Sequence, residues 1–261
     1  MKKSQPIIDC HVNLTPDGGW FATGHKADLG RLLGEMDQAG VAGALLVALP
    51  GAAENSYIAE ICARYPEKFR GLGHVKDWSN PEAEIAIIRS MGLSGVKAHP
   101  RMQNLDVLDP ALDRAWRVIS EAGLPLLLDG YFQNHADGLS LEKFTPFYYD
   151  RLARRHPELC IILAHAGAQR VLDAMWVARS NPNFYLDISH VLAYYSGTSL
   201  ISDIAMVMDM CDKKVLYGSD FPEYGIGEYL DIFYKTARTR PGMDVRAVLC
   251  GNLKKIIDFG C

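Results

Sequence analysis

Three residues with metal-binding side chains, His11, His165 and Asp220, each lie at the end of a short apolar segment. Imidazole nitrogens and carboxylate oxygens are good ligands for zinc and manganese. A bound cation of this kind would lower the pKa of water from about 15.7 towards ~7, which makes hydroxide available at neutral pH. The three residue types therefore suggest metal-dependent hydrolysis, provided that the fold brings them together.

Further polar residues occupy the same kind of position, near or just after the end of an apolar segment. They are Asn13, His74, Lys97, His99, Asp129 and His190. Each of them also has a structural interpretation. A histidine can join strand ends through hydrogen bonds, a carboxylate can cap a helix, and Asp129 before Gly130 is a common turn sequence. Residue type alone does not distinguish a catalytic role from a structural one. The distinction depends on where the helices and strands of the fold place each side chain.

Short apolar segments alternate with helical patterns along the whole chain. The predicted strands cover residues 6–12, 41–49, 69–75, 93–98, 124–128, 159–164, 184–188 and 215–217. This alternation favours parallel βαβ units, and eight units in 261 residues favour an α/β fold, the closed (β/α)8 TIM barrel. An open doubly wound sheet is the alternative, but no Gly-x-Gly-x-x-Gly motif follows the first strand. In a barrel, the carboxyl ends of all strands meet at one rim, so the polar residues would converge there.

Helical patterns fill the intervals between the predicted strands. Helices are predicted near residues 26–39, 54–65, 80–91, 109–122, 141–156, 168–179, 199–211, 227–238 and 244–257. Pro146 could kink or break the fifth of them. In the first strand, residues 9, 11 and 13 should share one face, and the apolar residues 8, 10 and 12 should pack under the helices.

The composition is that of an ordinary globular chain, and no linker-like segment divides it, so we predict a single domain over residues 1–261. A net charge of -4 without a basic stripe argues against nucleic-acid binding. No apolar run approaches the ~20 residues of a membrane span, and Asp9 and His11 interrupt any signal-like segment, so we expect neither membrane insertion nor export. The six scattered cysteines form no Cys-x-x-Cys pair and indicate reduced thiols, hence a cytoplasmic location.

Five segments carry a resemblance to a known family when they are considered together. They are Ile8-Asp9-Cys10-His11-Val12-Asn13, Gly95-Val96-Lys97-Ala98-His99-Pro100, Ile161-Ile162-Leu163-Ala164-His165-Ala166-Gly167, Val215–Pro222 and Gly251-Asn252-Leu253. In this order along the chain they resemble the amidohydrolase superfamily, and more narrowly its amidohydrolase-related branch of metal-dependent hydrolases and decarboxylases. The resemblance implies a (β/α)8 barrel in which a metal activates water or holds the substrate.

The resemblance also implies a ligand set, from which this sequence departs at two positions. The family usually has His-x-His in its first strand and a histidine after its fifth strand, where this chain has His11-x-Asn13 and Asp129. Asparagine is a poor zinc ligand, whereas Asp129 would favour a harder metal such as manganese. The resemblance therefore implies one zinc or manganese ion, rather than two, bound by His11, Asp129, His165 and Asp220. A site without metal is the alternative.

We predict that the chain hydrolyses a small-molecule amide, ester or lactone. Asp220 would accept a proton and pass it to the leaving group, and His165 would bind the metal or polarise the scissile carbonyl. The residues predicted to contact the substrate are Lys97, His99, His190 and Asn13. Two alternatives stay open: a metal-dependent decarboxylase in which Asp220 protonates carbon, and a metal-free lactonase or ligand-binding barrel. Such barrels often pair through surface helices, so a homo-oligomer is also an expectation.

Overall fold

The computed structural model describes residues 6–132 and 138–259, and its centre is one parallel sheet. Eight strands pair in the order in which they occur along the chain. They are β1 (Ile7–Asn13), β2 (Val41–Val47), β3 (Phe69–His74), β4 (Gly95–Ala98), β5 (Leu126–Leu128), β6 (Ile161–Leu163), β7 (Phe184–Asp187) and β8 (Val215–Leu216). All the predicted strands are confirmed, with small differences at their ends.

Backbone hydrogen bonds join the two ends of this sheet. The amide of Cys10 donates to the carbonyl of Tyr217 at 2.8 Å, and the amide of Asn13 donates to the carbonyl of Phe221 at 2.8 Å. Val12 and Phe221 also form a parallel bridge. Because β1 is bonded to both β2 and the end of β8, the sheet curls into a barrel. The predicted (β/α)8 barrel is confirmed, and the open doubly wound sheet is wrong.

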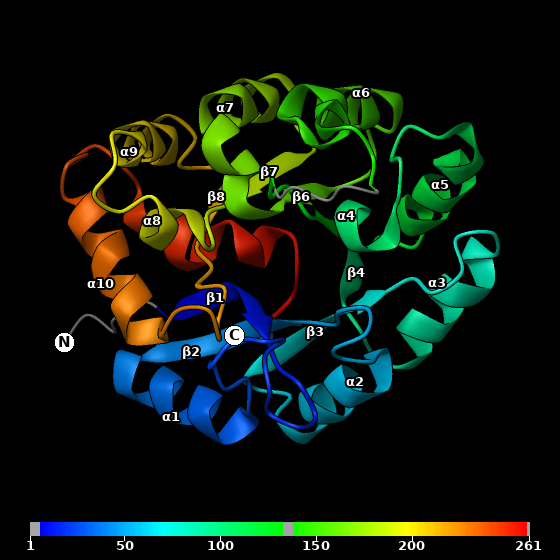
Figure 1. The fold of residues 1–261 in the computed structure, drawn as a ribbon, viewed down its shortest axis with the longest axis horizontal. Helices are drawn as coiled ribbons and strands as arrows, with labels where there is room; N and C mark the ends of the chain where they lie inside the picture. Colours follow the sequence, from blue (N-terminus) through cyan, green and yellow to red (C-terminus); the bar gives the residue numbers. More distant parts are fainter. Residues whose placement is uncertain (1–5, 133–137, 260–261) are drawn as a thin grey trace.

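Helical segments connect the strands. They are α1 (Leu29–Ala39), α2 (Asn55–Arg64), α3 (Pro81–Ser90), α4 (Pro100–Gln103), η1 (Pro110–Leu112), α5 (Asp113–Glu121), η2 (Leu141–Phe144), α6 (Pro146–Arg155), η3 (Ala164–Arg170), α7 (Val171–Ser180), α8 (Val191–Tyr194), α9 (Leu200–Met210) and α10 (Ile226–Ala237). The longer helices form a ring around the strands, whereas α4 and α8 lie nearer its centre (Figure 1). Pro146 begins α6 at a position where its missing N–H costs nothing, so it separates η2 from α6 and does not kink a single helix.

The final predicted helix, over residues 244–257, is confirmed as a helical segment, but it is not one regular α-helix. It consists mainly of a π-helix, η4 (Ala247–Gly251), and a 3-10 helix, η5 (Leu253–Lys255). Between them, the buried side chain of Asn252 donates to the carbonyls of Asp212 at 2.7 Å and Val215 at 2.8 Å. Leu253 packs in the same apolar cluster as Leu216. These contacts with β8 lie where the π-helix gives way to the 3-10 helix.

The two faces predicted for the first strand are also wrong in part. The pairing of β1 with β2 shifts register between Asp9 and Val12. Cys10 consequently packs in the cluster that contains Leu45 and Leu216, and Val12 packs in the larger cluster together with helix residues. A bulge of this kind breaks the strict alternation of a strand. The neighbouring residues Cys10 and His11 therefore both face the interior of the barrel, Cys10 in the apolar cluster and His11 in the cavity.

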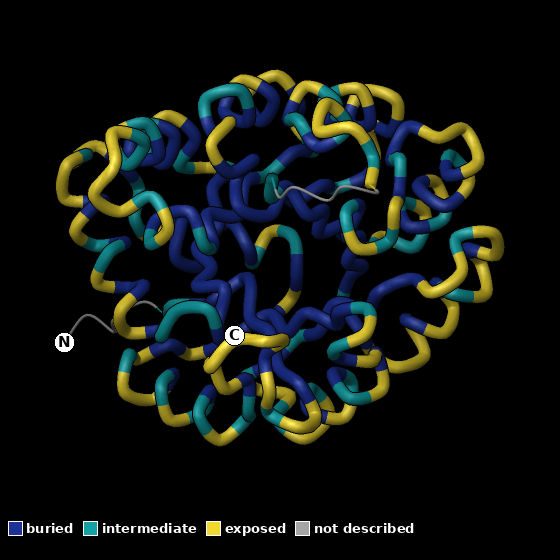
Figure 2. The backbone as a smooth tube through the Cα atoms, in the orientation of Figure 1, coloured by how far each residue is buried: buried dark blue, intermediate teal, exposed yellow. Residues whose placement is uncertain are grey.

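Burial follows the layers of the barrel. The central strands are buried along their length, and the outer surfaces of the helices are exposed (Figure 2). In α5, for example, the buried residues Ala115, Trp116 and Ile119 recur at the spacing of one helical face. No helix within residues 6–132 or 138–259 combines the length and the apolar character that a bilayer span requires.

Candidate active site

A cavity of about 540 Å³ contains every residue that the sequence predicted for the site. It is lined by His11, Asn13, Trp20, Phe21, Leu49, Lys97, His99, Arg101, Met102, Asp129, Tyr131, His165, His190, Asp220 and Glu223. These residues come from loops and strand ends after β1, β2, β4, β5, β6, β7 and β8. The convergence of strand ends in a parallel barrel therefore collects side chains that lie far apart in the sequence.

His11, His165 and Asp220 form the centre of this cavity. Each of them offers one ligand atom, and these atoms all lie within 4.8 Å of one another. The two imidazole rings stack with centroids 5.1 Å apart and an angle of 25° between their planes. Nε2 of His11 lies 3.9 Å from Oδ1 of Asp220. Two imidazoles and one carboxylate in this arrangement match the ligands that zinc and manganese accept.

The outer ring nitrogens of both histidines have hydrogen-bond partners behind the cavity. Nδ1 of His11 lies 2.7 Å from Oδ2 of Asp187. Nδ1 of His165 lies 3.1 Å from Oγ of Ser189 and 3.3 Å from the Ser189 carbonyl oxygen. Metal-binding histidines in proteins almost always have such a partner on the nitrogen that does not bind the metal. The residues present therefore fit a divalent cation.

Asp220 is ionised at neutral pH and is oriented from two sides. Asn13 donates from Nδ2 to Oδ1 at 3.2 Å, and Nδ1 of His190 lies 3.3 Å from Oδ2. Burial alone would raise the pKa of Asp220, but the hydrogen bond with His190 and the neighbouring histidines outweigh it and lower the pKa to about 2. Asn13 thus contacts Asp220, one of the candidate metal ligands. Because the Asp220 carboxyl is so acidic, it can accept a proton only from a group whose own pKa has been lowered, such as a metal-bound water.

Asp129 lies beside this centre, among basic side chains. Its Oδ1 accepts a hydrogen bond from Nε of Arg101 at 3.1 Å, and its Oδ2 lies 3.3 Å from Nε2 of His99 and 3.6 Å from Nε2 of His165. Burial alone would raise its pKa, but His99 and Arg101 outweigh burial and hold the pKa well below the ordinary range. Its role as a fourth metal ligand stays a prediction, because Arg101 already pairs with this carboxylate.

His99 contributes to the site as a neutral ring. Burial lowers its pKa to about 3. Its Nδ1 accepts a weak hydrogen bond from the amide of Met102 at 3.4 Å. The hydrogen of the neutral ring then lies on Nε2, directed at Asp129. His99 therefore supports Asp129 as a donor and adds no positive charge to the cavity.

Lys97 and Arg101 place two cationic side chains in the cavity. Lys97 is 1% exposed, and its Nζ lies 3.9 Å from Oδ2 of Asp129, beyond hydrogen-bond distance. Burial lowers the pKa of Lys97. The side chain of Arg101 also lines the cavity and is only 9% exposed.

Positive φ angles mark three of the site residues. φ is 57° at His165, 67° at His190 and 64° at Asp220. Ala166 (φ 45°) and Gly167 (φ 71°) continue the left-handed turn that His165 begins. Such conformations are costly for residues other than glycine and persist where the surrounding structure enforces them, often at functional sites. The sequence patterns did not predict these turns.

Asp187 and Ser189 are buried residues of the site that the sequence interpretation missed. The signal that could have identified them is their spacing: two polar residues at i and i+2 at the end of an apolar strand share one face. A Cβ atom on Gly218 would lie 2.8 Å from Oδ1 of Asp187 and 3.1 Å from Cβ of His11. The glycine in the Gly-Ser-Asp sequence therefore allows β8 to approach this pair closely.

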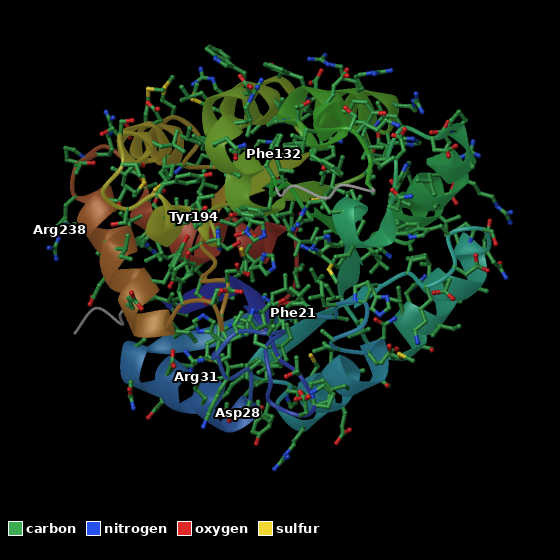
Figure 3. The ribbon with its side chains drawn as sticks, viewed as in Figure 1. Phe21, Asp28, Arg31, Phe132, Tyr194 and Arg238 are labelled. Atoms are coloured by element: carbon green, nitrogen blue, oxygen red, sulfur yellow. The ribbon has the colours of Figure 1, made fainter. Side chains whose placement is uncertain are left out.

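Aromatic side chains surround the entrance. Tyr194 stacks on His190 with centroids 5.0 Å apart, and Tyr131 meets His190 edge-on at 4.8 Å. Phe21 and Tyr194 remain 60% and 54% exposed, respectively. Both lie on the inner side of the helix ring (Figure 3). They supply apolar surface next to the polar centre.

His74 lies outside the cavity lining and is almost fully buried. Among the described residues, neither of its ring nitrogens has a hydrogen-bond partner. His74, which the sequence placed among the polar residues expected at the rim, is therefore not part of the cavity lining. Burial lowers the pKa of His74, which is consistent with a neutral side chain in the barrel wall.

The sequence of this chain also matches a known protein family. The family model described as Amidohydrolase matches residues 8–256. This chain belongs to the amidohydrolase family. The resemblance inferred from its five segments is thus confirmed, and the chain is an enzyme of this superfamily. A comparison with curated proteins gives no significant match.

Solved structures show the same fold in other amidohydrolase-like barrels. An uncharacterised TIM-barrel protein from Bordetella bronchiseptica aligns with a TM-score of 0.80 at 19% identity, covering 96% of this chain and 98% of its own. A probable 2-pyrone-4,6-dicarboxylic acid hydrolase from Acinetobacter baumannii, with citric acid bound, has a TM-score of 0.72 at 14% identity and coverage of 98% and 99%. A 5-carboxyvanillate decarboxylase from Novosphingobium aromaticivorans, complexed with manganese and 4-hydroxy-3-methoxy-5-nitrobenzoic acid, has a TM-score of 0.70 at 17% identity and coverage of 97% and 96%. The TM-scores show a shared fold, and at identities of 14–19% they show the fold alone.

Proposed function

We propose that this amidohydrolase hydrolyses a small amide, ester or lactone with the help of one zinc or manganese ion. The observation that carries the proposal is the convergence of ligand atoms from His11, His165 and Asp220 within 4.8 Å. A divalent cation bound by these residues would supply Lewis acidity, which polarises a substrate oxygen and makes a nearby water more acidic. The manganese in the Novosphingobium decarboxylase supports the choice of metals.

Asp220 is the proton acceptor in this proposal. Its Oδ1 faces His11, and Asn13 orients that oxygen through a hydrogen bond of 3.2 Å. Its Oδ2 lies 3.3 Å from His190, which also lines the cavity. A proton accepted by the carboxylate can therefore pass to a leaving group on the His190 side.

Lys97 favours a substrate with an anionic group or a developing negative charge. Its ammonium group lies inside the cavity, near Oδ2 of Asp129, and Arg101 lines the same cavity and pairs with Oδ1. Because the cavity measures about 540 Å³, the substrate is expected to be a small molecule. A small carboxylic acid that carries an ester, a lactone or an amide satisfies both conditions.

The test is turnover of a panel of amides, esters and lactones with added zinc or manganese. Asp220→Asn should lower kcat by about 10²–10⁴-fold, the usual contribution of a proton-transfer group. His165→Ala should abolish both metal binding and turnover. Asp203→Asn, on the outer helix α9, is the matched control and should behave as the wild type. Wild-type turnover in both site variants would exclude these roles.

Metal analysis of protein purified without chelators tests the cofactor separately. One divalent ion per chain, lost in His165→Ala, is the expected result. No bound ion, even after incubation with zinc and manganese, would discard the metal-dependent mechanism and leave the metal-free lactonase as the explanation of turnover.

Decarboxylation is the second candidate, and Lys97 is the observation that favours it. A cation inside the cavity could hold a substrate carboxylate, with Asp220 as the group that protonates carbon. Product analysis separates the two reactions. Carbon dioxide release without incorporation of oxygen from ¹⁸O-labelled water would favour the lyase, and incorporation into the product would favour the hydrolase.

A further inference from the structure

Asp187 accepts hydrogen bonds at both carboxylate oxygens. The amide of Ser189 donates to Oδ1 at 2.7 Å, the hydroxyl of Ser189 donates to Oδ2 at 2.8 Å, and Nδ1 of His11 lies 2.7 Å from Oδ2. The two donors of Ser189, one at each oxygen, are the pattern of an ionised carboxylate, which has no hydrogen of its own to give. Nδ1 of His11 must therefore carry the ring hydrogen. Its Nε2 is then bare: it carries no hydrogen and offers a lone pair.

Ser189 also determines which ring nitrogen of His165 carries the hydrogen. Its single hydroxyl hydrogen is directed at Asp187, so its oxygen can only accept from the imidazole 3.1 Å away. The carbonyl oxygen of Ser189, 3.3 Å from the same Nδ1, is also an acceptor. Both contacts require the hydrogen of His165 on Nδ1. Its Nε2 is therefore bare as well.

We propose that Asp187 and Ser189 are the positioning residues that hold both histidines in the Nδ1–H form, so that two bare Nε2 atoms face one ligand position. The opposite tautomer would place N–H groups towards Asp220 and Asp129, whose oxygens lie 3.9 and 3.6 Å from the two Nε2 atoms. The histidines would then pair with these carboxylates and close the site to a cation. The metal role rests on the proposed function, whereas the tautomer itself does not.

The proposal predicts different effects for the two positioning residues. Asp187→Asn removes the carboxylate but keeps its shape, so His11 should populate the Nε2–H form and metal affinity should fall by about 10–100-fold. Ser189→Ala removes the hydroxyl at His165 but keeps the carbonyl at 3.3 Å, so His165 should populate the Nε2–H form only in part. His11 loses the Ser189 Oγ at 3.2 Å but keeps Asp187 at 2.7 Å, so its tautomer should be unchanged. Ser189→Thr retains the hydroxyl and should keep the wild-type tautomers. Ser202→Ala, on α9, is the control, and it should show wild-type folding, tautomers and metal affinity.

The readout is ¹⁵N NMR of the imidazole rings in metal-free protein, with resonances assigned from His11→Gln and His165→Gln. Calorimetric titration with Mn²⁺ and Zn²⁺ gives the affinities. An Nε2–H tautomer of either histidine in the wild type would overturn the proposal even if no variant folds. Unchanged tautomers with wild-type affinity in Asp187→Asn would overturn it too. Wild-type Nδ1–H tautomers without any metal binding would instead refute the metal-dependent function and leave the positioning role intact.

Discussion

Nδ1 of His190 lies 3.3 Å from Oδ2 of Asp220, and both residues have backbone conformations that side chains usually avoid. His190 has φ 67° and ψ −51°, and the amide of Val191 donates to the carbonyl of Ser189 at 2.7 Å. This is a γ-turn of the rare, strained class, centred on His190. Strain of this kind costs about 1–3 kcal/mol and persists because the surrounding structure enforces it.

Replacement of His190 should separate stability from activity. Glycine tolerates positive φ, whereas alanine retains the strain, so His190→Gly should be about 1 kcal/mol more stable than His190→Ala. Both variants should lose turnover, because neither offers a ring to Asp220. Urea denaturation and steady-state kinetics measure the two effects. Equal stabilities of the variants would show that the turn at this position is not strained.

Metal removal should lower thermal stability. Saturation at about 100 times the dissociation constant stabilises the folded state by about 2.7 kcal/mol, which corresponds to roughly 5–10 °C in Tm for a chain of this size. Chelation of the loaded wild type should reverse this shift. Asp220→Asn should show little or no shift with zinc or manganese, whereas Asp203→Asn should show the full one. An identical shift in Asp220→Asn would remove this carboxylate from the ligand set.

The buried pair between Arg101 and Asp129 should show strong coupling. Arg101→Met leaves the carboxylate without its guanidinium partner and should cost about 3 kcal/mol of unfolding free energy in metal-free protein. In an Asp129→Asn background the same change should cost clearly less, because the carboxylate that pairs with Arg101 is then already absent. Chemical denaturation of the four proteins in this cycle measures the coupling. Equal costs in both backgrounds would contradict the pairing.

Asp106 should make folding stability depend on pH at some distance from the site. It accepts hydrogen bonds from Lys143 Nζ and Tyr148 OH, both at 2.6 Å. Burial alone would raise its pKa, but these bonds outweigh it and lower the pKa below the ordinary 3.8. A folded-state pKa below the unfolded one stabilises the protein above about pH 4, and the contribution is lost as pH falls through the folded value. Asp106→Asn should therefore be about 1 kcal/mol less stable at pH 7.

The comparison that tests this effect is denaturation of wild type and Asp106→Asn between pH 7 and acid pH. The difference in unfolding free energy should shrink as pH falls. Tyr148→Phe removes one of the two donors and should reproduce part of the loss at pH 7. A difference that stays constant down to acid pH would assign the effect to packing and not to the charge.

Local patterns were sufficient for most of the fold. Alternating apolar and helical segments predicted all eight strands, because hydrophobic periodicity reports directly on which side of an element is buried. The segment over residues 244–257 shows the limit of this reasoning. The pattern predicted a helix there but not its change from π-helix to 3-10 helix at Asn252, whose side chain bonds to the backbone near β8.

The sequence by itself also determined where the cavity residues lie. His11, Lys97, His165 and Asp220 follow predicted strands, and a parallel barrel brings such positions to one rim. What only the tertiary structure decided is how they are connected. His11 and Asp187 are 176 positions apart, yet Nδ1 and Oδ2 lie 2.7 Å from each other. Periodicity is a local property of the chain, whereas a hydrogen bond depends on the closed barrel, so the pairing that orients the histidines exists only in three dimensions.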